Sequence, residues 1–423
     1  MKLAFVTPRY GGEIVSGAEH ACRLLAERLS ERHEIDVVTT TARDPHTWKN
    51  EYPEGTDRVR GVLVRRFSVS QPHEEDVFRQ TSARLLGAPR SREEELDWVR
   101  QLGPCAPGLL EHLKRQHRSY EALVFFSLHH WTTVLGLPVA PERSILFPGL
   151  RLSPILRFAL WPELVSSARA IGYMSGSERN LLHSYLRAGV GHEELVGIGV
   201  EPAHAQTYPR HQQDPADDTV DDDAVTDPEA VPPEDERADR GVPFRRRHRL
   251  LGPIVLYGGR VEPDNGCEEM LEYFDTYAAA DGHTSLVLMG VKMMRVFDEP
   301  YLRQAGILPD RERAIAYEAA DVTLAPGSDD LLAQSVLESL AVGTPVLACA
   351  RSEAAVEHIR RANGGLYYAN RDEFVEGLRT LMSAPLLREQ LGESGRQYVQ
   401  QQYRWDAVLG RFERLVTAVK SRA

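Results

Sequence analysis

YGGRVEPDNGCEEMLEYF, residues 257–274, opens the second half of the chain and decides its fold. It begins as the end of a buried strand, turns at a pair of glycines, presents Arg260 and continues as an amphipathic helix. A glycine turn before a helix N-terminus lets backbone N–H groups approach an anion. Because an arginine directly after a buried strand is costly without an anionic partner, Arg260 pairs with a protein carboxylate or with a ligand phosphate. Its planar fork suits a diphosphate.

Short apolar segments, many of them β-branched, alternate with helical stretches along both halves of the chain. In the first half the predicted strands are residues 3–7, 34–40, 62–69, 122–127, 144–147, 170–175 and 195–200. In the second half they are residues 253–257, 285–289, 321–325 and 345–350. Two consecutive series of this kind predict an α/β protein with two doubly wound, mostly parallel sheets. Ligands of such sheets bind beyond the carboxyl ends of the strands.

The composition is that of a soluble globular protein, with 42% hydrophobic and 26% charged residues. A net charge of −12 argues against general binding of nucleic acid. No run of 18 apolar residues is present, so the sequence predicts no transmembrane helix. The four cysteines lack a C-x-x-C spacing, and we expect reduced thiols in a cytoplasmic protein.

Twelve acidic residues and one arginine lie between Asp214 and Asp239, in a proline-containing segment without aromatic residues. Such a segment buries too little apolar surface to offset the entropy that ordering it would cost. Residues 201–250 are therefore predicted to form an acidic insert or linker without fixed structure. The insert is either a solvated linker or a docking segment for a protein partner.

Gly11 and Gly12 follow the first predicted strand, and Ser16 and Glu19 form a capping box for a helix over residues 17–29. Glycines in this position let backbone N–H groups approach an anion. A tight structural turn explains them equally well, so both interpretations stay open at this point.

His129 and His130 directly follow the predicted strand at residues 122–127, so they stand at a carboxyl end. Either one of them lines a ligand cleft or both serve packing and loop polarity. The sequence contains no H-E-x-x-H motif and no Cys/His cluster, so it predicts no metal site. It also lacks a Walker loop and a G-x-S-x-G elbow.

Asp330 and Glu338 lie eight positions apart, after the predicted strand at residues 321–325. If Asp330 precedes a helix and Glu338 lies two turns inside it, both carboxylates line one side of a pocket. Carboxylates in this position accept pairs of hydrogen bonds from vicinal hydroxyls, as on ribose and hexose. Considered alone, two acids at a helix start are more often capping groups and surface charge.

With these residues the chain resembles the GT-B-fold glycosyltransferases of family 4, also called group 1, over nearly its full length. The segments that carry the resemblance are PRYGGEIVSGAEHACRLLAERL, GIGVEP, YGGRVEPDNGCEEMLEYF and VLESLAVGTPVLAC. The resemblance implies two Rossmann-like domains facing across a cleft, an acceptor-side domain at residues 1–200 and a donor domain at residues 251–402. It also implies that a C-terminal helix, residues 403–423, crosses back to the first domain.

The resemblance further implies a reaction. A sugar would move from a nucleotide-sugar donor to a glycan, lipid-linked or small-molecule acceptor, with retention at the anomeric carbon and without a metal or other cofactor. Gly11 and Gly12 would approach the donor phosphates, and Arg260 would clamp the diphosphate. Asp330 and Glu338 stand where the family's paired glutamates touch the donor sugar and the ribose. Arg260 and Asp330 are therefore the predicted catalytic residues.

Several of these positions depart from the family's pattern. Asn265 stands where the family has a lysine, and Asp330 stands where it has a glutamate. Leu331 and Leu332 replace a small turn that contains glycine or serine. Arg151 occupies the place of a usual histidine and is a candidate to replace the missing phosphate cation. The predicted donor-binding residues are Gly11, Gly12, Gly259, Arg260, Asn265, Asp330, Leu331, Leu332 and Glu338.

The sequence thus supports an active glycosyltransferase of polysaccharide or glycolipid assembly, cytoplasmic or peripheral at the inner face of the membrane. The alternative from another class is a non-catalytic GT-B protein that binds a nucleotide, a glycan or a partner enzyme. A third alternative is another GT-B activity, such as that of a phosphorylase or an epimerase. Asn265, Asp330 and Arg151 favour the non-catalytic protein, whereas Arg260 and Glu338 favour the transferase.

Overall fold

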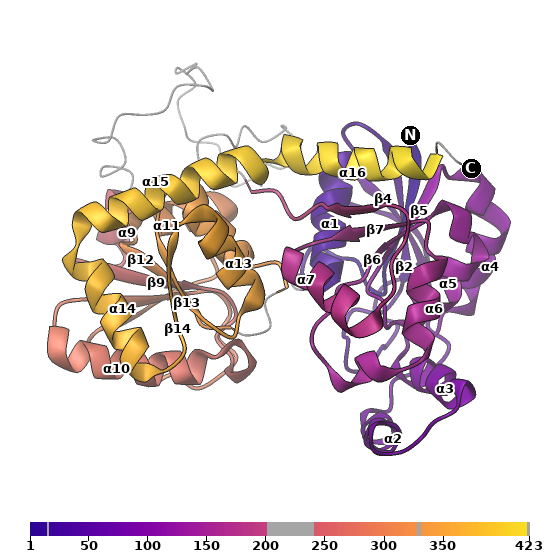
Figure 1. Cartoon of the computed structure of the whole chain (residues 1–423), viewed down its shortest axis with the longest axis horizontal. Coiled ribbons are helices and arrows are strands. Elements are labelled where there is room, and N and C mark those ends of the chain that lie inside the picture. The colour runs from indigo at the N-terminus through magenta and orange to yellow at the C-terminus, as the bar shows by residue number, and fades with distance from the viewer. Residues whose placement is uncertain (15–16, 201–240, 328–330, 421–423) are drawn as a thin grey trace. The chain divides into compact units, whose positions relative to one another are not determined.

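The computed structural model of the chain describes residues 1–14, 17–200, 241–327 and 331–420, and these divide into two units (Figure 1). The first unit contains Met1–Ile198 and the C-terminal stretch from Asp406, and the second contains Gly199–Trp405. Each unit is built around one sheet that is mostly or wholly parallel. The predicted acidic insert, residues 201–240, lies outside the described residues.

The first unit contains an eight-stranded sheet in the order β3-β4-β2-β1-β5-β6-β7-β8. Its strands are β1 Lys2–Val6, β2 Glu34–Thr40, β3 Gly55–Val59, β4 Val62–Phe67, β5 Ala122–Phe126, β6 Ser144–Phe147, β7 Ala170–Tyr173 and β8 Glu193–Leu195. Its helices are α1 Gly17–Leu29, α2 Glu75–Gly87, α3 Arg92–Leu102, α4 Pro107–Gln116, α5 Trp131–Gly136, α6 Leu160–Ser167, α7 Gly176–Leu181 and α16 Trp405–Lys420. All strand pairs are parallel except β3 with β4.

The second unit contains a six-stranded parallel sheet in the order β11-β10-β9-β12-β13-β14. Its strands are β9 Ile254–Gly258, β10 Ser285–Met289, β11 Leu302–Gly306, β12 Val322–Ala325, β13 Val346–Cys349 and β14 Gly365–Tyr368. Its helices are α9 Val242–Arg247, α10 Cys267–Asp281, α11 Asp310–Ala319, α12 Gln334–Ala341, α13 Glu353–Ala362, α14 Arg371–Ser383 and α15 Pro385–Gln402.

The central strands of both sheets are almost entirely apolar because helices cover both faces of each sheet. In the first unit every residue of β5 is buried. The ring of Phe125 joins a core cluster that helices α3 to α6 cover, with Leu109 and Trp161 among its members. In the second unit the buried residues of β9 divide between two clusters, with Val255 in one and Leu256 in the other. This alternation follows from the two-residue period of a strand.

The structure differs from the predicted elements in a few places. The strand predicted at residues 195–200 is replaced by β8, because the chain turns at Gly197, where φ is +72°. Strands β3, β11 and β14 were not predicted. Residues 241–250, which the sequence analysis assigned to the linker, belong to the second unit, since α9 buries Phe244 beside Leu250.

Helix α16 brings the C-terminal end of the chain back to the first unit, as the resemblance implies (Figure 1). The ring of Phe412 on α16 is buried, with its centroid 5.7 Å from that of Phe5 and 6.1 Å from that of Phe147. At the end of the helix Lys420 forms an ion pair with Glu121. The face of the sheet that carries Phe5 therefore depends on α16 for part of its cover.

This dependence predicts the effect of truncating the buried ring. Phe412→Ala should lower the free energy of unfolding by about 3–5 kcal/mol, because it removes a fully buried ring and leaves a cavity. Arg414→Ala is the matched control on the same helix, since its exposed ion pair with Glu194 is worth at most about 1 kcal/mol. Equilibrium unfolding in urea measures both. Equal losses for the two variants would contradict the proposed packing role of α16.

Candidate functional site

The carboxyl ends of the central strands are the places where each sheet can bind a ligand. Strand β1 lies between β2 and β5, and β9 lies between β10 and β12. After such a central strand the chain first adds strands on one side of it and later adds strands on its other side. The loops that follow the central strand and its later neighbour therefore diverge, and ligands bind between them. In the second unit Arg260 follows β9, and Pro326 follows β12. Arg260 thus lies on the edge where the sequence analysis expected a ligand.

The loops after β9 and β12 touch each other through glycines. Gly266 has a φ of +70°, and a Cβ atom there would lie 2.7 Å from the carbonyl oxygen of Pro326. A Cβ atom on Gly327 would lie 3.5 Å from the carbonyl oxygen of Asn265. Any side chain at position 266 would therefore push the two loops apart and strain the backbone.

Asn265 stabilises the loop that carries Arg260. Its Nδ2 atom donates to the carbonyl oxygen of Arg260 at 3.0 Å, and the hydroxyl of Tyr257 donates to the same oxygen at 2.8 Å. In the structure the side chain of Asn265 therefore serves the backbone of the Arg260 loop. The side chain of Asn265 supplies an uncharged hydrogen bond there and no cation.

The guanidinium of Arg260 has a protein partner. Its Nη2 atom lies 2.9 Å from Oε1 of Glu262, and 41% of the Arg260 side chain is exposed. The Glu262 side chain is only 13% exposed. Of the two partners that the sequence left open, the protein carboxylate is present, while the exposed fork keeps donors for a second anion.

Glu338 lies in the middle of α12 and is held by two side chains. Its Oε1 atom accepts from Nη2 of Arg313 on α11 and from Nε2 of Gln334, each at 2.8 Å. Burial raises the pKa of the Glu338 carboxyl above its ordinary value, although the charge of Arg313 acts in the opposite direction. The contact of Arg313 with Glu338 could not be predicted, because nothing in the sequence tells which residue of α11 faces α12.

Asp330, the predicted catalytic carboxylate, lies outside the described residues. Leu331 and Leu332, which follow it, are 8% and 6% exposed and are part of the buried core. Their side chains therefore offer no polar group to a ligand. The roles of all three residues stay predictions.

The two glycines of the first loop have different surroundings. A Cβ atom on Gly11 would lie 2.3 Å from the hydroxyl oxygen of Tyr52 and 2.9 Å from both carboxylate oxygens of Glu13. A Cβ atom on Gly12 would meet no heavy atom within 4 Å. Gly11 is thus needed for packing, and Gly12 borders open space at the carboxyl end of β1.

Tyr52 is held in place by a buried arginine that the sequence analysis missed. Arg66 on β4 is 2% exposed, its guanidinium carbon lies 3.9 Å from the ring centroid of Tyr52, and Nη1 donates to the carbonyl oxygen of Tyr10 at 2.8 Å. Burial lowers the pKa of the Arg66 guanidinium. The two-residue period of β4 places Arg66 on the same buried face as Val62 and Val64. This alternation is the feature of the sequence that indicates a buried Arg66.

A second cation of this edge is also engaged by protein groups. Arg9 donates from Nε and Nη2 to the two carboxylate oxygens of Glu19, both at 2.8 Å, and from Nη1 to the carbonyl oxygen of Arg43 at 2.9 Å. Glu19 was predicted to be part of a capping box with Ser16, but Ser16 lies outside the described residues. The bidentate pair links the segment after β1 to the first turn of α1.

His129 and His130 lie at the carboxyl end of β5, where they were predicted, among aromatic rings. The ring of His129 packs edge-on against Trp161 at 5.0 Å, and that of His130 packs edge-on against Trp48 at 5.8 Å. Burial lowers the pKa of both imidazoles to about 3, so both rings are neutral near pH 7. Their contacts favour the packing interpretation.

Arg151, the candidate replacement cation, is exposed in the loop that follows β6. Across the described residues it forms no ion pair, and no contact connects it with Gly11 or Gly12. In the same part of the chain no cluster of three or more His, Cys, Asp or Glu side chains is arranged to hold a metal ion. None of the described helices combines the length and the hydropathy needed to cross a membrane.

The comparison with solved structures defines the fold. The chain is similar to sucrose-phosphate synthase from Thermosynechococcus elongatus, with 16% identity and a TM-score of 0.67 over 100% of both chains. It is similar to HepE from Anabaena in complex with UDP and glucose, with 12% identity and a TM-score of 0.65 over 99% of both chains. Starch synthase IV from Arabidopsis thaliana, bound to ADP and acarbose, matches with 12% identity and a TM-score of 0.60 over 100% of this chain and 99% of that one.

The fold of the chain is therefore GT-B, with two Rossmann-like units and a C-terminal helix that returns to the first. Within this fold, residues 243–398 match the family model described as Glycosyl transferases group 1. The matched residues lie in the second unit and include Arg260, Asn265 and Glu338. A search of curated proteins by sequence gave no match.

The different surroundings of the two glycines predict different costs for the same added methyl group. Gly11→Ala should destabilise the protein by about 1–3 kcal/mol, because the methyl group would overpack the space that Tyr52 and Glu13 fill. Gly12→Ala should leave the stability within about 0.5 kcal/mol, because its methyl group would enter open space. Urea unfolding curves compare the two variants directly. A larger loss for Gly12→Ala than for Gly11→Ala would show that the loop has another conformation.

Proposed function

We propose that the chain is a retaining, metal-independent glycosyltransferase that moves a sugar from a nucleotide-sugar donor to a glycan, lipid-linked or small-molecule acceptor. One observation carries the proposal. Arg260 lies at the switch point of the unit that matches the group 1 model, and Glu338 lies in α12, the helix that follows β12. The solved structures support the choice of donor, since HepE was solved with UDP and glucose and starch synthase IV with ADP.

Arg260 is proposed to hold the donor diphosphate. Its exposed fork can donate to a phosphate oxygen while one N–H group stays with Glu262, or it can exchange Glu262 for the phosphate. Support of the charge that develops on the leaving diphosphate would be the main catalytic effect, together with positioning of donor and acceptor. The proposed transfer uses no cofactor, and Gly259 lets the backbone of the loop approach the ligand.

Glu338 is proposed to accept hydrogen bonds from the ribose hydroxyls. A carboxylate has about four lone-pair sites, and Arg313 and Gln334 together use part of them while they fix its orientation. Asp330 is proposed to touch the donor sugar, with the backbone at Leu331 and Leu332 beside it.

The proposal also covers the first unit and the setting of the reaction. Gly12, with Gly11 beneath it, is proposed to approach the donor phosphates. The most fitting settings are polysaccharide or glycolipid assembly at the cytoplasmic face of the membrane, where peripheral contact would bring a lipid-linked acceptor within reach. The acidic segment between Asp214 and Asp239 is proposed either to stay solvated or to dock a protein partner.

A second candidate function is favoured by the contacts of the donor-site residues. Asn265 supplies a hydrogen bond to Arg260 where the family has a cation, Arg260 pairs with Glu262, and Glu338 pairs with Arg313. A non-catalytic GT-B protein that binds a nucleotide, a glycan or a partner enzyme would show the same pattern. The two candidates differ in turnover of a nucleotide sugar, and both include binding of a nucleotide.

Nucleotide binding is the first prediction of the proposed function. One of UDP, ADP, GDP and dTDP, at 100 times its dissociation constant, should stabilise the protein by about 2.7 kcal/mol, which a thermal-shift assay detects. Arg260→Ala should weaken this binding roughly 10- to 100-fold, because it removes a charge-assisted hydrogen bond. Gly12→Ala should also weaken it, because the added methyl group blocks the approach of the backbone.

The control for this experiment is Arg379→Ala, which removes an exposed arginine on α14 whose ion pair within the described part of the chain is with Glu376, three residues before it. Its nucleotide affinity should equal that of the wild type. Absence of a thermal shift with every nucleotide would refute the donor site. An equal loss of nucleotide affinity in both arginine variants would show that the loss comes from the change in net charge.

The altered positions give a second prediction, which separates the two candidate functions. Asn265→Lys combined with Asp330→Glu should raise the rate of nucleotide diphosphate release from the matching nucleotide sugar roughly 10-fold or more, because one charge-assisted contact is restored. Asn265→Ala is the control, since it removes the bond to the Arg260 carbonyl without adding a cation and should lower the rate. If the wild type and the double variant both bind nucleotide without turnover, the non-catalytic function is correct.

A further inference from the structure

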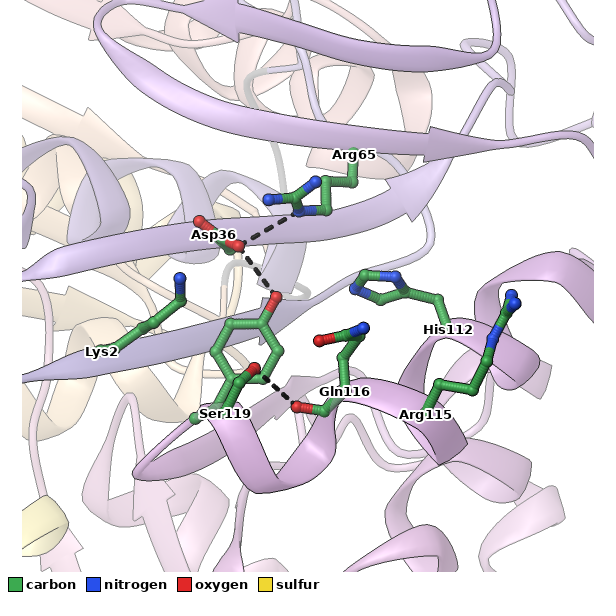
Figure 2. A pocket seen from close by; sticks show the side chains of 8 residues that line it. Lys2, Asp36, Arg65, His112, Arg115, Gln116 and Ser119 are labelled. Atoms are coloured by element: carbon green, nitrogen blue, oxygen red, sulfur yellow. Dashed lines mark hydrogen bonds and ion pairs between the residues drawn. The ribbon is translucent and has the colours of Figure 1, made fainter.

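A polar pocket opens in the first unit at the amino ends of the strands, on the rim opposite to the glycine loop (Figure 2). Its volume is about 510 Å³, within the roughly 300–1,000 Å³ of pockets that hold small ligands. Lys2 contributes from the start of β1, and Ser119 and Tyr120 lie shortly before β5. Because β1 spans five residues at about 3.3 Å each, the pocket lies roughly 16 Å from the carboxyl end of that strand, after which the glycine loop begins. It is therefore separate from that loop.

The charged groups that line the pocket are mostly cationic. The lining contains three cationic side chains, those of Lys2, Arg65 and Arg115, and one carboxylate, that of Asp36. Burial and the two nearby arginines lower the pKa of His112, against the effect of Asp36, so this imidazole is neutral near pH 7. The lining thus has a net charge of +2. Such a pocket attracts a dianion.

The three cations are not equally engaged. The Nε atom of Arg65 donates to Oδ2 of Asp36 at 3.1 Å, and Lys2 pairs with the exposed carboxylate of Glu34 at 2.6 Å. Arg115 donates from Nε to the carbonyl oxygen of Glu111 at 3.2 Å. Within the described part of the chain, no carboxylate lies within ion-pair distance of Arg115. Its guanidinium is the group best placed to receive an anion.

Two buried polar atoms of the pocket lack a partner among the described residues. Asp36 is 1% exposed, and its Oδ1 atom accepts no hydrogen bond, although its Oδ2 atom accepts from Arg65 and from the hydroxyl of Tyr120 at 2.8 Å. The Nε2 atom of His112 is likewise buried without a partner. A buried carboxylate oxygen requires a donor, which a ligand hydroxyl supplies. A ligand that matches this pocket therefore carries hydroxyl groups as well as negative charge.

The group that needs a hydroxyl donor and the group that can bind an anion lie at different ends of the pocket. Figure 2 shows Asp36 and Lys2 at one end of the pocket and Arg115 at the other, with Arg65 and His112 between them. A ligand that spans the pocket would place a hydroxyl group against Asp36 and an anionic group against Arg115. Arginine forks match the geometry of phosphate oxygens, and a phosphate monoester carries close to two negative charges at pH 7.

We propose that this pocket is a second binding site, for the phosphate monoester of a polyhydroxy compound such as a sugar phosphate. All of its lining residues belong to the first unit, so a ligand there would bind through residues of that unit. The same chemistry occurs in two sources, a soluble sugar phosphate and the headgroup of a lipid.

Titration calorimetry on the full chain tests the site with glucose 6-phosphate, inorganic phosphate and glucose as probes. Glucose 6-phosphate should bind more tightly than inorganic phosphate and than glucose, because only it meets both ends of the pocket. Arg115→Ala should weaken its binding roughly 10-fold or more. Because Arg115 is exposed and binds only a backbone carbonyl, this variant should fold normally.

Two controls make the result specific. Arg118→Ala removes an exposed arginine that lies three residues further on and does not line the pocket, so it should leave the affinity unchanged. Arg260→Ala should also leave it unchanged, because that residue is in the second unit. An equal loss in Arg118→Ala, or a loss only in Arg260→Ala, would overturn the proposal, as would the absence of binding by every probe in this and the vesicle assay.

A second variant tests the charge balance, and a vesicle assay identifies the source. Asp36→Asn removes the one lining carboxylate and should strengthen binding of inorganic phosphate; a weaker binding by this folded variant would contradict the electrostatic basis. Cosedimentation with phosphatidylinositol 4-phosphate vesicles that depends on Arg115 but not on Arg118 would support the site and assign it to a lipid headgroup. Binding of the soluble ester alone would support it and assign it to a sugar phosphate.

Discussion

The close approach of Gly266 to the carbonyl oxygen of Pro326 is the constraint on which the carboxyl edge of the sheet in the second unit depends. It brings the loop after β9 into contact with the loop after β12, which are neighbours at the switch point of the sheet. Asn265 precedes this glycine and holds the carbonyl of Arg260 at the same time. A side chain at position 266 would therefore disturb the loop contact and, through Asn265, the position of the Arg260 guanidinium.

The charged residues of this edge already form ion pairs within the protein. A ligand would therefore have to share or replace these protein partners. Arg260 pairs with Glu262, and Glu338 pairs with Arg313, all of them at least partly accessible to water. Such partly exposed pairs are worth only about 0–1 kcal/mol, whereas a charge-assisted hydrogen bond in an enclosed site is worth about 1.5–3 kcal/mol. In the proposed function a phosphate would therefore share the guanidinium of Arg260 with Glu262, since the mostly buried carboxylate of Glu262 needs a donor.

The sequence predicted the parts of this arrangement that local pattern determines. Arg260 after a buried strand and Glu338 inside a helix follow from hydrophobic periodicity and glycine turns, and the helix at residues 17–29 has the predicted bounds. The partners could not be predicted, because Arg313 and Tyr52 meet their targets only after distant elements pack. The different roles of neighbouring glycines were also beyond the sequence, since the space above Gly11 is filled from another loop. Strand β3 was missed because its exposed residues show no apolar alternation.

The cations on the two rims of the sheet in the first unit are paired with carboxylates to different extents. On the carboxyl rim Arg9 is bound bidentately by Glu19, and the carboxylate of Glu13 lies beside Gly11. On the amino rim the cations of the pocket exceed the single carboxylate of Asp36. On the carboxyl rim Glu19 and Glu13 engage Arg9 and Arg43, whereas on the amino rim, among the described residues, Arg115 has no carboxylate within ion-pair distance. An anion that reaches the first unit would therefore displace fewer ion pairs at the amino rim than at the carboxyl rim.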